Sequence, residues 1–367
     1  MTTCYVNGKF LMQRMTGVQR FAAELVRATD GLLQAGALPG TARRWVLLHP
    51  PGARPPAYRH IESRAVGAAG QPLHLWEQGA LPLAARRGLL LNLAGSAPWF
   101  AARQVCTFHD AAVFDRPEAY TTAFKLWYRA LFRHAGRRAS RVLTVSEFSR
   151  GRLVACLGLA PGRIGVVPNA ADHLAAVSAD PGVLGRLGLL PARYLLAVAS
   201  ANPSKNLAAL QAAFARLPAG LGLNLVIVGG ANAGVFASGS SGAPAQAGSR
   251  VLHTGVLPDS ELKALYQQAL ALVFPSLYEG FGLPPLEAMA CDCPVIAARA
   301  AALPEVCGDA ALYVDPASVD EMAAALHRLA VDGAERERLR SAGRLRAAAF
   351  SWRRSAECLL REVEAVA

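Results

Sequence analysis

The chain of 367 residues is 53% hydrophobic and 17% charged, so it can form two domains with sizeable cores. Its formal net charge of +12 at pH 7 suggests an anionic partner such as a nucleotide diphosphate, an anionic lipid surface or nucleic acid. The sequence shows no signal-peptide pattern and no run of about 18 apolar residues that could span a membrane, which argues against secreted and integral membrane proteins.

The seven cysteines are odd in number and scattered, which is typical of buried reduced thiols in a cytosolic protein rather than of a disulfide framework. Cys291 and Cys293 are too closely spaced for a usual zinc knuckle, and no histidine lies nearby in the sequence. We therefore expect no metal site at these cysteines.

In chain order, the first half alternates short apolar runs with amphipathic segments. Strands are predicted at residues 4–7, 45–49, 89–93, 105–108, 142–145 and 163–167. Helices are predicted from Gly17 to about Thr29 and from Ala119 to Arg138, and Ser146 is suited to cap a further helix that has Ser149 in its first turn.

Gly17 and Val18 open the first of these helices, shortly after the first predicted strand. A glycine at the start of a helix lets a phosphate group approach the backbone N–H groups. Taken alone, this pattern more often marks a simple turn.

His109 and Asp110 directly follow the apolar run 105–108. Polar residues at the carboxyl end of a parallel strand point into the ligand crevice of an open α/β sheet. His109 could exchange a proton with a substrate hydroxyl near neutral pH, and Asp110 could orient it or act as the base. The alternative is a strand-end histidine that is hydrogen-bonded to the backbone.

The predicted helix 119–138 and the residues after it are rich in cations: Lys125, Arg129, Arg133, His134, Arg137, Arg138, Arg141, Arg150 and Arg152. One interpretation is a solvated face, and the other is a surface that rests on anionic lipid headgroups. The apolar residues of the same helix, Trp127, Tyr128, Leu131 and Phe132, are predicted to lie mostly in the core.

The second half repeats the alternation of strand and helix after a linker at residues 175–191. Strands are predicted at residues 194–199, 223–228, 251–254, 272–274, 294–297 and 311–314, and helices from Leu207, from Asp259 as the cap to Ala269, from Val319, at 334–350 and at 352–366. The Gly/Ser/Ala-rich stretch 231–250 is expected to be a mobile loop. Two doubly wound parallel sheets follow from this pattern.

The stretch from Phe274 to Asp315 carries the most specific signal, because Glu279 and Glu287 stand in it with seven residues between them. Pro284 and Pro285 suit the first turn of a helix, where their missing N–H costs nothing, and Glu287 is expected in that turn. Backbone N–H groups at such a helix start can bind an anion. Carboxylates beside them would instead bind the hydroxyl groups of a ribose or a sugar. The alternative is a βα unit with two solvated glutamates.

This stretch, with its E-x7-E spacing and its GFGLP, EAMA, CPVIA and LPEV segments, resembles the retaining glycosyltransferases of family 4, which have the GT-B fold. The resemblance implies that Glu279 contacts the donor sugar and that Glu287 holds the ribose hydroxyls. The intervening loop amides would contact sugar and diphosphate; they belong to Gly280, Phe281, Gly282 and Leu283.

Further segments of the chain resemble the same family. T-G-V-Q-R at 16–20 resembles a T-G-x-x-R loop that faces the donor and includes Gly17 and Val18. Lys205 and Asn206 lie in a segment that resembles R-K-N-L, where a lysine neutralises the diphosphate, although a solvated loop lysine is the alternative. Val256 and Leu257 resemble the loop whose backbone contacts the nucleobase.

The resemblance also gives His109 and Asp110, with Lys205 and Glu279, as the catalytic candidates. Trp76-Glu77-Gln78 resembles a W-E-Q segment of some bacterial members, for which packing of Trp76 is the expected role.

Three positions depart from the family pattern. Ser200 and Ser204 stand where arginines are common, so one guanidinium of the diphosphate site is expected to be missing. Ala170 replaces the glycine of a P-N-G-V-D segment, which indicates that the backbone there needs no positive φ.

The resemblance implies two Rossmann-like domains that face a cleft. Residues 1–175 would bind the acceptor, and residues 190–348 would bind the nucleotide sugar. The last helix, 349–367, would pack back toward the first domain. The expected activity is metal-independent, retaining transfer of a sugar from a nucleotide-diphosphate sugar, with GDP-mannose favoured and no cofactor. The expected acceptor is a saccharide or a lipid-linked saccharide in bacterial O-antigen or exopolysaccharide assembly. This setting would place the protein in the cytoplasm. Peripheral contact with an anionic membrane is a further option.

Three other functions stay open. A nucleotide-sugar 2-epimerase has the same fold but would convert the donor without an acceptor. A sugar phosphorylase would need a lysine that binds pyridoxal phosphate, and this chain is short for one. A basic, non-enzymatic anion or nucleic-acid binder would account for the charge, but the aromatic residues mostly lie in apolar strands and helices, so nucleic acid is not an expected partner.

Overall fold

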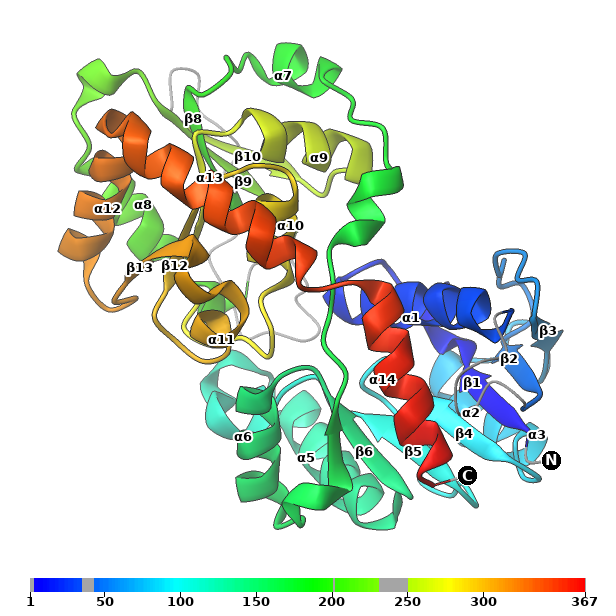
Figure 1. The fold of residues 1–367 in the computed structure, drawn as a ribbon. Coiled ribbons are helices and arrows are strands. Elements are labelled where there is room, and N and C mark those ends of the chain that lie inside the picture. Colours follow the sequence, from blue (N-terminus) through cyan, green and yellow to red (C-terminus); the bar gives the residue numbers. More distant parts are fainter. Residues whose placement is uncertain (1–2, 35–42, 201, 231–249, 367) are drawn as a thin grey trace. The chain divides into compact units, whose positions relative to one another are not determined.

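A computed structural model describes residues 3–34, 43–200, 202–230 and 250–366. The chain forms two compact units (Figure 1). The first unit holds the residues before 115, residues 126–169 and the residues after 350, and the second holds residues 115–125 and 170–350. The predicted mobile loop at 231–250 falls almost entirely outside the described residues.

The first unit is built on a parallel sheet of seven strands in the order β3-β2-β1-β4-β5-β6-β7. The strands are β1 (Cys4–Asn7), β2 (Trp45–His49), β3 (Ile61–Ala65), β4 (Leu89–Asn92), β5 (Gln104–Thr107), β6 (Arg141–Thr144) and β7 (Ile164–Val166). The helices are α1 (Gly17–Leu33), α2 (Leu73–Gln78), α3 (Ala80–Ala84), α4 (Ala112–Asp115), α5 (Thr122–Arg138), α6 (Glu147–Leu157) and the last helix α14 (Trp352–Glu364), which packs along α1.

The second unit is built on a parallel sheet of six strands in the order β10-β9-β8-β11-β12-β13. The strands are β8 (Tyr194–Val198), β9 (Asn224–Val228), β10 (Val251–Gly255), β11 (Ala271–Phe274), β12 (Val295–Ala298) and β13 (Ala311–Val314). The helices are α7 (Gly182–Leu187), α8 (Leu207–Ala215), α9 (Asp259–Gln268), α10 (Leu283–Ala290), α11 (Leu303–Cys307), α12 (Val319–Val331) and α13 (Gly333–Ala348).

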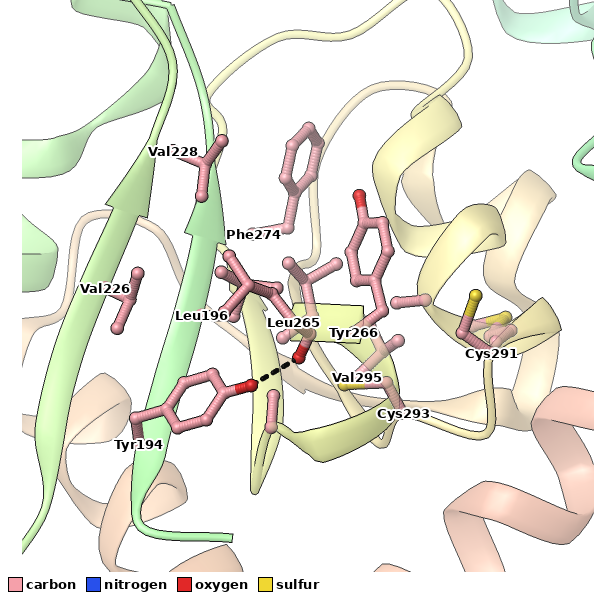
Figure 2. Close-up of a cluster of buried hydrophobic side chains, with 14 of the residues drawn as sticks. Tyr194, Leu196, Val226, Val228, Leu265, Tyr266, Phe274, Cys291, Cys293 and Val295 are labelled. Carbon is pink, nitrogen blue, oxygen red and sulfur yellow. Dashed lines mark hydrogen bonds between the residues drawn. The ribbon is translucent and has the colours of Figure 1, made fainter. Parts of the chain in front are cut away.

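Strands β8, β11 and β12 of the second sheet are apolar and almost fully buried, as expected for strands that are covered by helices on both faces. Leu196, Val226 and Phe274 belong to the core on one face, which Figure 2 shows with the buried hydroxyl of Tyr194 donating to the carbonyl oxygen of Leu265 at 2.7 Å. The alternate residues of the same strands, such as Leu195, belong to the core on the other face. The predicted doubly wound α/β fold is confirmed in both units.

Several predicted boundaries differ from the structure. Strand β3 was not predicted, because only Ile61 of its five residues is buried and the apolar signal of this edge strand is weak. Helix α5 begins at Thr122 rather than Ala119, and the expected linker contains helix α7. Pro258, not Asp259, occupies the N-cap position of α9.

Other local predictions are confirmed. The Ser146 side chain caps α6 by accepting from the N–H of Ser149 at 3.0 Å, and Ala170 has no positive φ. All seven cysteines are free, and burial raises the pKa of the Cys4, Cys106, Cys291, Cys293 and Cys307 thiols to about 12. Every helix of the described chain is too short or too polar to cross a membrane.

Candidate functional site

The second sheet reverses its strand order between β8 and β11, and the predicted donor residues lie at this point. In open parallel sheets, ligands bind beyond the carboxyl ends of the two strands on either side of such a reversal. Lys205 and Asn206 follow β8, and Glu279 follows β11. The topology therefore brings together two segments that lie some 70 residues apart in the sequence.

Lys205 and Glu279 form an ion pair, in which the Lys205 ammonium nitrogen lies 2.6 Å from Glu279 Oε1. The side chains are 20% and 14% exposed, so the pair is accessible but not fully hydrated. The same ammonium lies 5.4 Å from the centroid of the Phe274 ring. Lys205 is thus held by a carboxylate that an incoming diphosphate could replace or share.

Backbone and side-chain contacts fix the two loops against each other. The N–H of Leu277 donates to the carbonyl oxygen of Ser204 at 2.8 Å. The Asn206 side-chain amide donates to the carbonyl oxygens of Pro275 at 3.3 Å and Pro316 at 2.8 Å. Asn206 has a φ of 57°, a left-handed conformation that asparagine tolerates well, so the chain can turn into α8 directly after Lys205.

The glycine-bearing loop ends at Gly282, which has a φ of 98° and caps α10. A Cβ added to Gly282 would lie 2.6 Å from a methyl group of Leu303, so a larger residue does not fit. Pro284 and Pro285 occupy the first turn, as predicted, and remove two N–H donors. The amides of residues 280–283, which are predicted to contact an anion, precede these prolines in the chain, and the Phe281 side chain is buried.

Glu287 lies in the second turn of α10 and not in the first, because the helix begins at Leu283. Its residue exposure is 7%, and the Tyr266 hydroxyl donates to Glu287 Oε2 at 3.1 Å. His173 Nε2 lies 3.3 Å from Oε1 of the same carboxylate. Sequence reasoning did not find His173 and Tyr266, and the only sequence signal for His173 is its place directly after the P-N-A-A-D segment.

Val256 and Leu257 follow β10 after Gly255, which has a φ of 72°. Val256 is 54% exposed, and Leu257 packs against the core. The carbonyl oxygen of Gly255 accepts from the N–H of Gly229 at 2.8 Å, so this loop is fixed beside the end of β9.

The first sheet reverses its strand order between β1 and β4, and polar side chains gather there as well. Gly17 begins α1, and the space around its Cα is open. Val18 and His109 both border Gly95, since a Cβ added to this glycine would lie 3.7 Å from a methyl carbon of Val18 and 3.7 Å from a ring carbon of His109. The structure thus brings Val18 and His109 together in the first unit.

His109 Nε2 donates to the carbonyl oxygen of Leu93 at 3.0 Å, and the ring packs edge-on against Phe21. Burial lowers the pKa of His109 to about 4, so the ring is neutral near pH 7 and the expected proton exchange at neutral pH is not supported. Asp110 Oδ1 accepts from the N–H of Ala112 at 2.8 Å, and among the described residues His109 has no hydrogen bond to Asp110. The bond to Ala112 stabilises the turn into α4.

Three of the cations predicted on and after α5 make contacts within the first unit. Arg129 donates to the carbonyl oxygen of Val113 at 2.7 Å, and Arg141 pairs with Glu362. Arg150 pairs with Glu147 at 2.7 Å. Trp127, predicted to lie mostly in the core, is 43% exposed.

Within the part of the chain that the structure describes, no three His, Cys, Asp or Glu side chains cluster in a way that could hold a metal ion.

Comparison with known families and proteins gives a consistent result. Residues 39–173 match the family described as Glycosyltransferase Family 4, and residues 190–346 match Glycosyl transferases group 1. The chain is 32% identical to O-antigen chain mannosyltransferase B of Escherichia coli over 68% of this chain and 67% of that protein.

A second relative, the MMP alpha-(1->4)-mannosyltransferase of Mycolicibacterium hassiacum, is 35% identical over 68% of this chain, and the match spans 62% of that protein's length. The crystal structure of Anabaena HepE in complex with UDP and glucose superimposes with a TM-score of 0.69 at 18% identity, covering 98% of this chain and 99% of that one. With its two Rossmann-like parallel-sheet units, the chain belongs to glycosyltransferase family 4 and has the GT-B fold.

Proposed function

We propose that the protein transfers a mannosyl group from GDP-mannose to a saccharide or lipid-linked saccharide acceptor, with retention of anomeric configuration. The observation that carries this proposal is the arrangement at the β8/β11 reversal, where one ammonium, one carboxylate and a proline-bounded amide loop meet. These are the groups that a diphosphate and a sugar hydroxyl require.

Each group in the second unit has a role in this proposal. Lys205 and the amides of residues 280–283 stabilise the negative charge that develops on the departing diphosphate. Glu279 accepts hydrogen bonds from the donor sugar, and Glu287, fixed by Tyr266, accepts from the ribose hydroxyls. Val256 and Leu257 offer backbone groups to the base, and Asn206 fixes the loop that carries Lys205.

The first unit receives the acceptor in this proposal, and Gly17 and Val18 contribute to the donor side. His109 acts as a neutral hydrogen-bonding group toward a hydroxyl, since its pKa is lowered by burial. The diphosphate charge is met by Lys205 and amides without a metal ion, and no cofactor other than the donor is used.

The choice of mannose rests on the relatives, because the two curated proteins reported above are both named mannosyltransferases. The first of them acts on an O-antigen chain, which supports bacterial polysaccharide assembly at the cytoplasmic side of the membrane as the setting. A UDP sugar is the second candidate donor, since HepE was crystallised with UDP and glucose.

A thermal-shift screen of nucleotides and nucleotide sugars, with and without EDTA, tests the donor site. GDP and GDP-mannose should raise Tm by several degrees, since a ligand at 100 times its Kd adds about 2.7 kcal/mol of stability. EDTA should leave the shift unchanged. Glu287→Ala should abolish it, while Glu321→Ala, at an exposed position of α12, should not. A shift with UDP sugars alone would overturn GDP-mannose, and no shift with any nucleotide would overturn the donor site.

Peripheral contact with an anionic membrane is proposed for the region around the start of α5. Phe100, Leu126 and Trp127 are 79%, 62% and 43% exposed, and the side chains of Arg133, Arg137 and Arg138 are exposed on the same helix. Exposed aromatic and aliphatic side chains beside arginines are typical of surfaces that enter the headgroup region.

Vesicle sedimentation tests this surface. The wild type should bind vesicles that contain phosphatidylglycerol and should not bind vesicles of phosphatidylcholine alone. Replacing Phe100 and Trp127 together by alanine should weaken binding by about tenfold or more, because each buried aromatic contributes more than 1 kcal/mol. Leu345→Ala, which removes an exposed leucine on α13, is the control. Equal binding of both vesicle types would contradict the proposal.

A further inference from the structure

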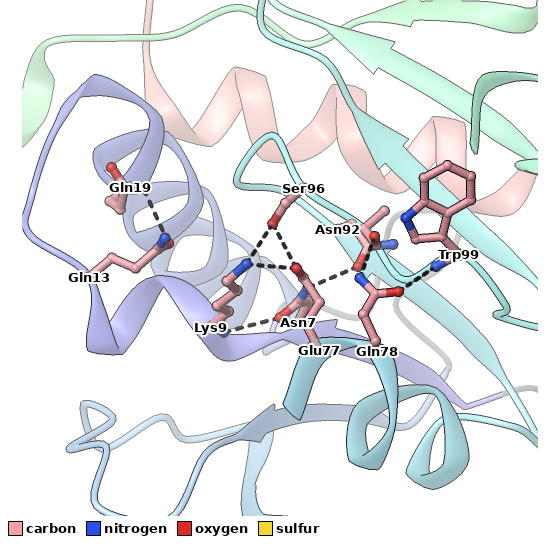
Figure 3. A network of polar contacts seen from close by, with 10 residues as sticks. Asn7, Lys9, Gln13, Gln19, Glu77, Gln78, Asn92, Ser96 and Trp99 are labelled. Carbon is pink, nitrogen blue, oxygen red and sulfur yellow. Dashed lines mark hydrogen bonds and ion pairs between the residues drawn. The ribbon is translucent and has the colours of Figure 1, made fainter. Parts of the chain in front are cut away.

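A buried polar cluster lies at the strand-order reversal of the first sheet (Figure 3). We call it the Glu77 cluster, and it comprises Asn7, Lys9, Glu77, Asn92 and Ser96. The Lys9 ammonium lies 2.6 Å from Glu77 Oε2, and Glu77 Oε1 accepts from Ser96 at 2.6 Å and from Asn7 at 3.1 Å. Asn7 also donates to Asn92 at 3.0 Å.

Burial and charge indicate what this cluster can do. Lys9 is 4% exposed and Glu77 is 1% exposed, so both charges are almost fully removed from water. Such a pair is tolerated only when its remaining hydrogen-bonding capacity is satisfied, as it is for Glu77. Because the two charges cancel, the cluster is a poor site for an anion. Its geometry is better suited to holding neighbouring loops.

The segment that the cluster holds is the loop 93–99, which follows β4. Ser96 contacts both Glu77 and, at 3.3 Å, the Lys9 ammonium. The next residue of α2, Gln78, donates to the carbonyl oxygen of Ala97 at 3.3 Å and accepts from the N–H of Trp99 at 2.9 Å. Trp76 anchors the same helix in the core by donating to the carbonyl oxygen of Val66 at 2.7 Å.

The first residue of this loop fixes His109. A carbonyl oxygen can only accept, so the bond from His109 Nε2 to Leu93 places the ring proton on Nε2. Nδ1 is then the acceptor, and among the residues that the structure describes it has no hydrogen-bond partner. Gly95, also in this loop, lies near the ring, since a Cβ added to it would be 3.7 Å from the Cδ2 atom of His109.

We propose that Glu77 and Gln78 are positioning residues, which hold loop 93–99 so that the Leu93 carbonyl keeps His109 in the Nε2–H tautomer. Nδ1 is then available to accept a hydrogen bond from a substrate hydroxyl. This inference rests on the proposed function for the role of His109 in transfer. It assigns a function to the Trp76-Glu77-Gln78 segment. Trp76 packs in the core, and the hydrogen bonds of Glu77 and Gln78 hold loop 93–99; we call these hydrogen bonds the clamp.

Ser96→Ala is the sharpest test, because it removes one hydroxyl that links the loop to Glu77 and leaves the Lys9–Glu77 pair intact. Long-range ¹H–¹⁵N spectra of the full chain, with His109→Gln for assignment, should show a single Nε2–H tautomer in the wild type and a mixture in Ser96→Ala. In the transfer assay, kcat should fall about tenfold to 10²-fold, as expected for a misplaced group, while the KM for GDP-mannose stays unchanged. Ser63→Ala, on the exposed face of β3, is the matched control.

The outcomes separate this inference from the proposed function. An unchanged His109 spectrum in Ser96→Ala would overturn the clamp, whatever the activity. A tautomer mixture with wild-type kcat would support the clamp and would overturn the role of His109 in transfer. Glu77→Gln is expected to destabilise the fold because it leaves the Lys9 charge buried without its partner, so Gln78→Ala serves as the second variant, with the same expected spectral change and loss of kcat.

Discussion

Replacing Lys205 by methionine is expected to lower kcat for mannosyl transfer by about 10²- to 10³-fold, the usual cost of removing one group that stabilises developing negative charge. The effect should lie at the upper end of this range. Ser200 and Ser204 stand where the family commonly carries arginine, and Ser204 is buried in the turn before Lys205. Lys205 is therefore the only cation among the predicted donor-binding residues.

The measurement is a steady-state transfer assay together with the affinity for GDP, so that loss of catalysis is separated from loss of binding. Arg216→Met is the matched control, because it removes a cation from an exposed pair with Asp320 in the same unit. The stability of Lys205→Met should fall, since the substitution leaves the largely buried Glu279 carboxylate without its partner, so the transfer assay is run below the Tm of the variant. A Lys205→Met enzyme with wild-type kcat would contradict the proposed leaving-group role.

The sequence predicted the two parallel sheets because most central strands contain an apolar run of three to five residues, as in β4, β8 and β11, a pattern typical of strands covered on both faces. It failed at β3 because an edge strand with one buried residue has no such pattern. The donor-side residues Lys205 and Glu279 were predicted for a similar local reason: each stands in a short, recognisable segment directly after a strand.

The contacts that orient those residues could not be predicted, because they join segments far apart in the sequence. Lys9 and Glu77 are 68 positions apart, and His173 reaches Glu287 from a segment that was expected to be only the end of the first domain. His109 shows the same limit. Its position after a strand was predicted. Its burial lowers its pKa, and its Nε2 donates to the carbonyl oxygen of Leu93. The loop that holds Leu93 lies 16 residues away, and nothing near His109 in the sequence specifies it.

Glu279→Gln is expected to separate binding from catalysis. Glu279 lies 2.6 Å from the Lys205 ammonium, and its negative charge disfavours a diphosphate beside the same ammonium. The neutral amide removes this repulsion and frees the ammonium. GDP should therefore bind roughly threefold to tenfold more tightly, equal to about 0.7–1.4 kcal/mol.

The same substitution should lower kcat for transfer by about 10²-fold or more, because an amide is a weaker acceptor than a carboxylate for the sugar hydroxyl and cannot stabilise positive charge on the sugar. GDP-mannose should gain less affinity than GDP, since only the sugar nucleotide loses a charged hydrogen bond. Titration calorimetry with both ligands measures this difference, and Asp320→Asn, at a position whose side chain is 91% exposed, is the control. Weaker binding of GDP by Glu279→Gln would show that the carboxylate serves the nucleotide itself, and the assignment of Glu279 to the sugar would then be wrong.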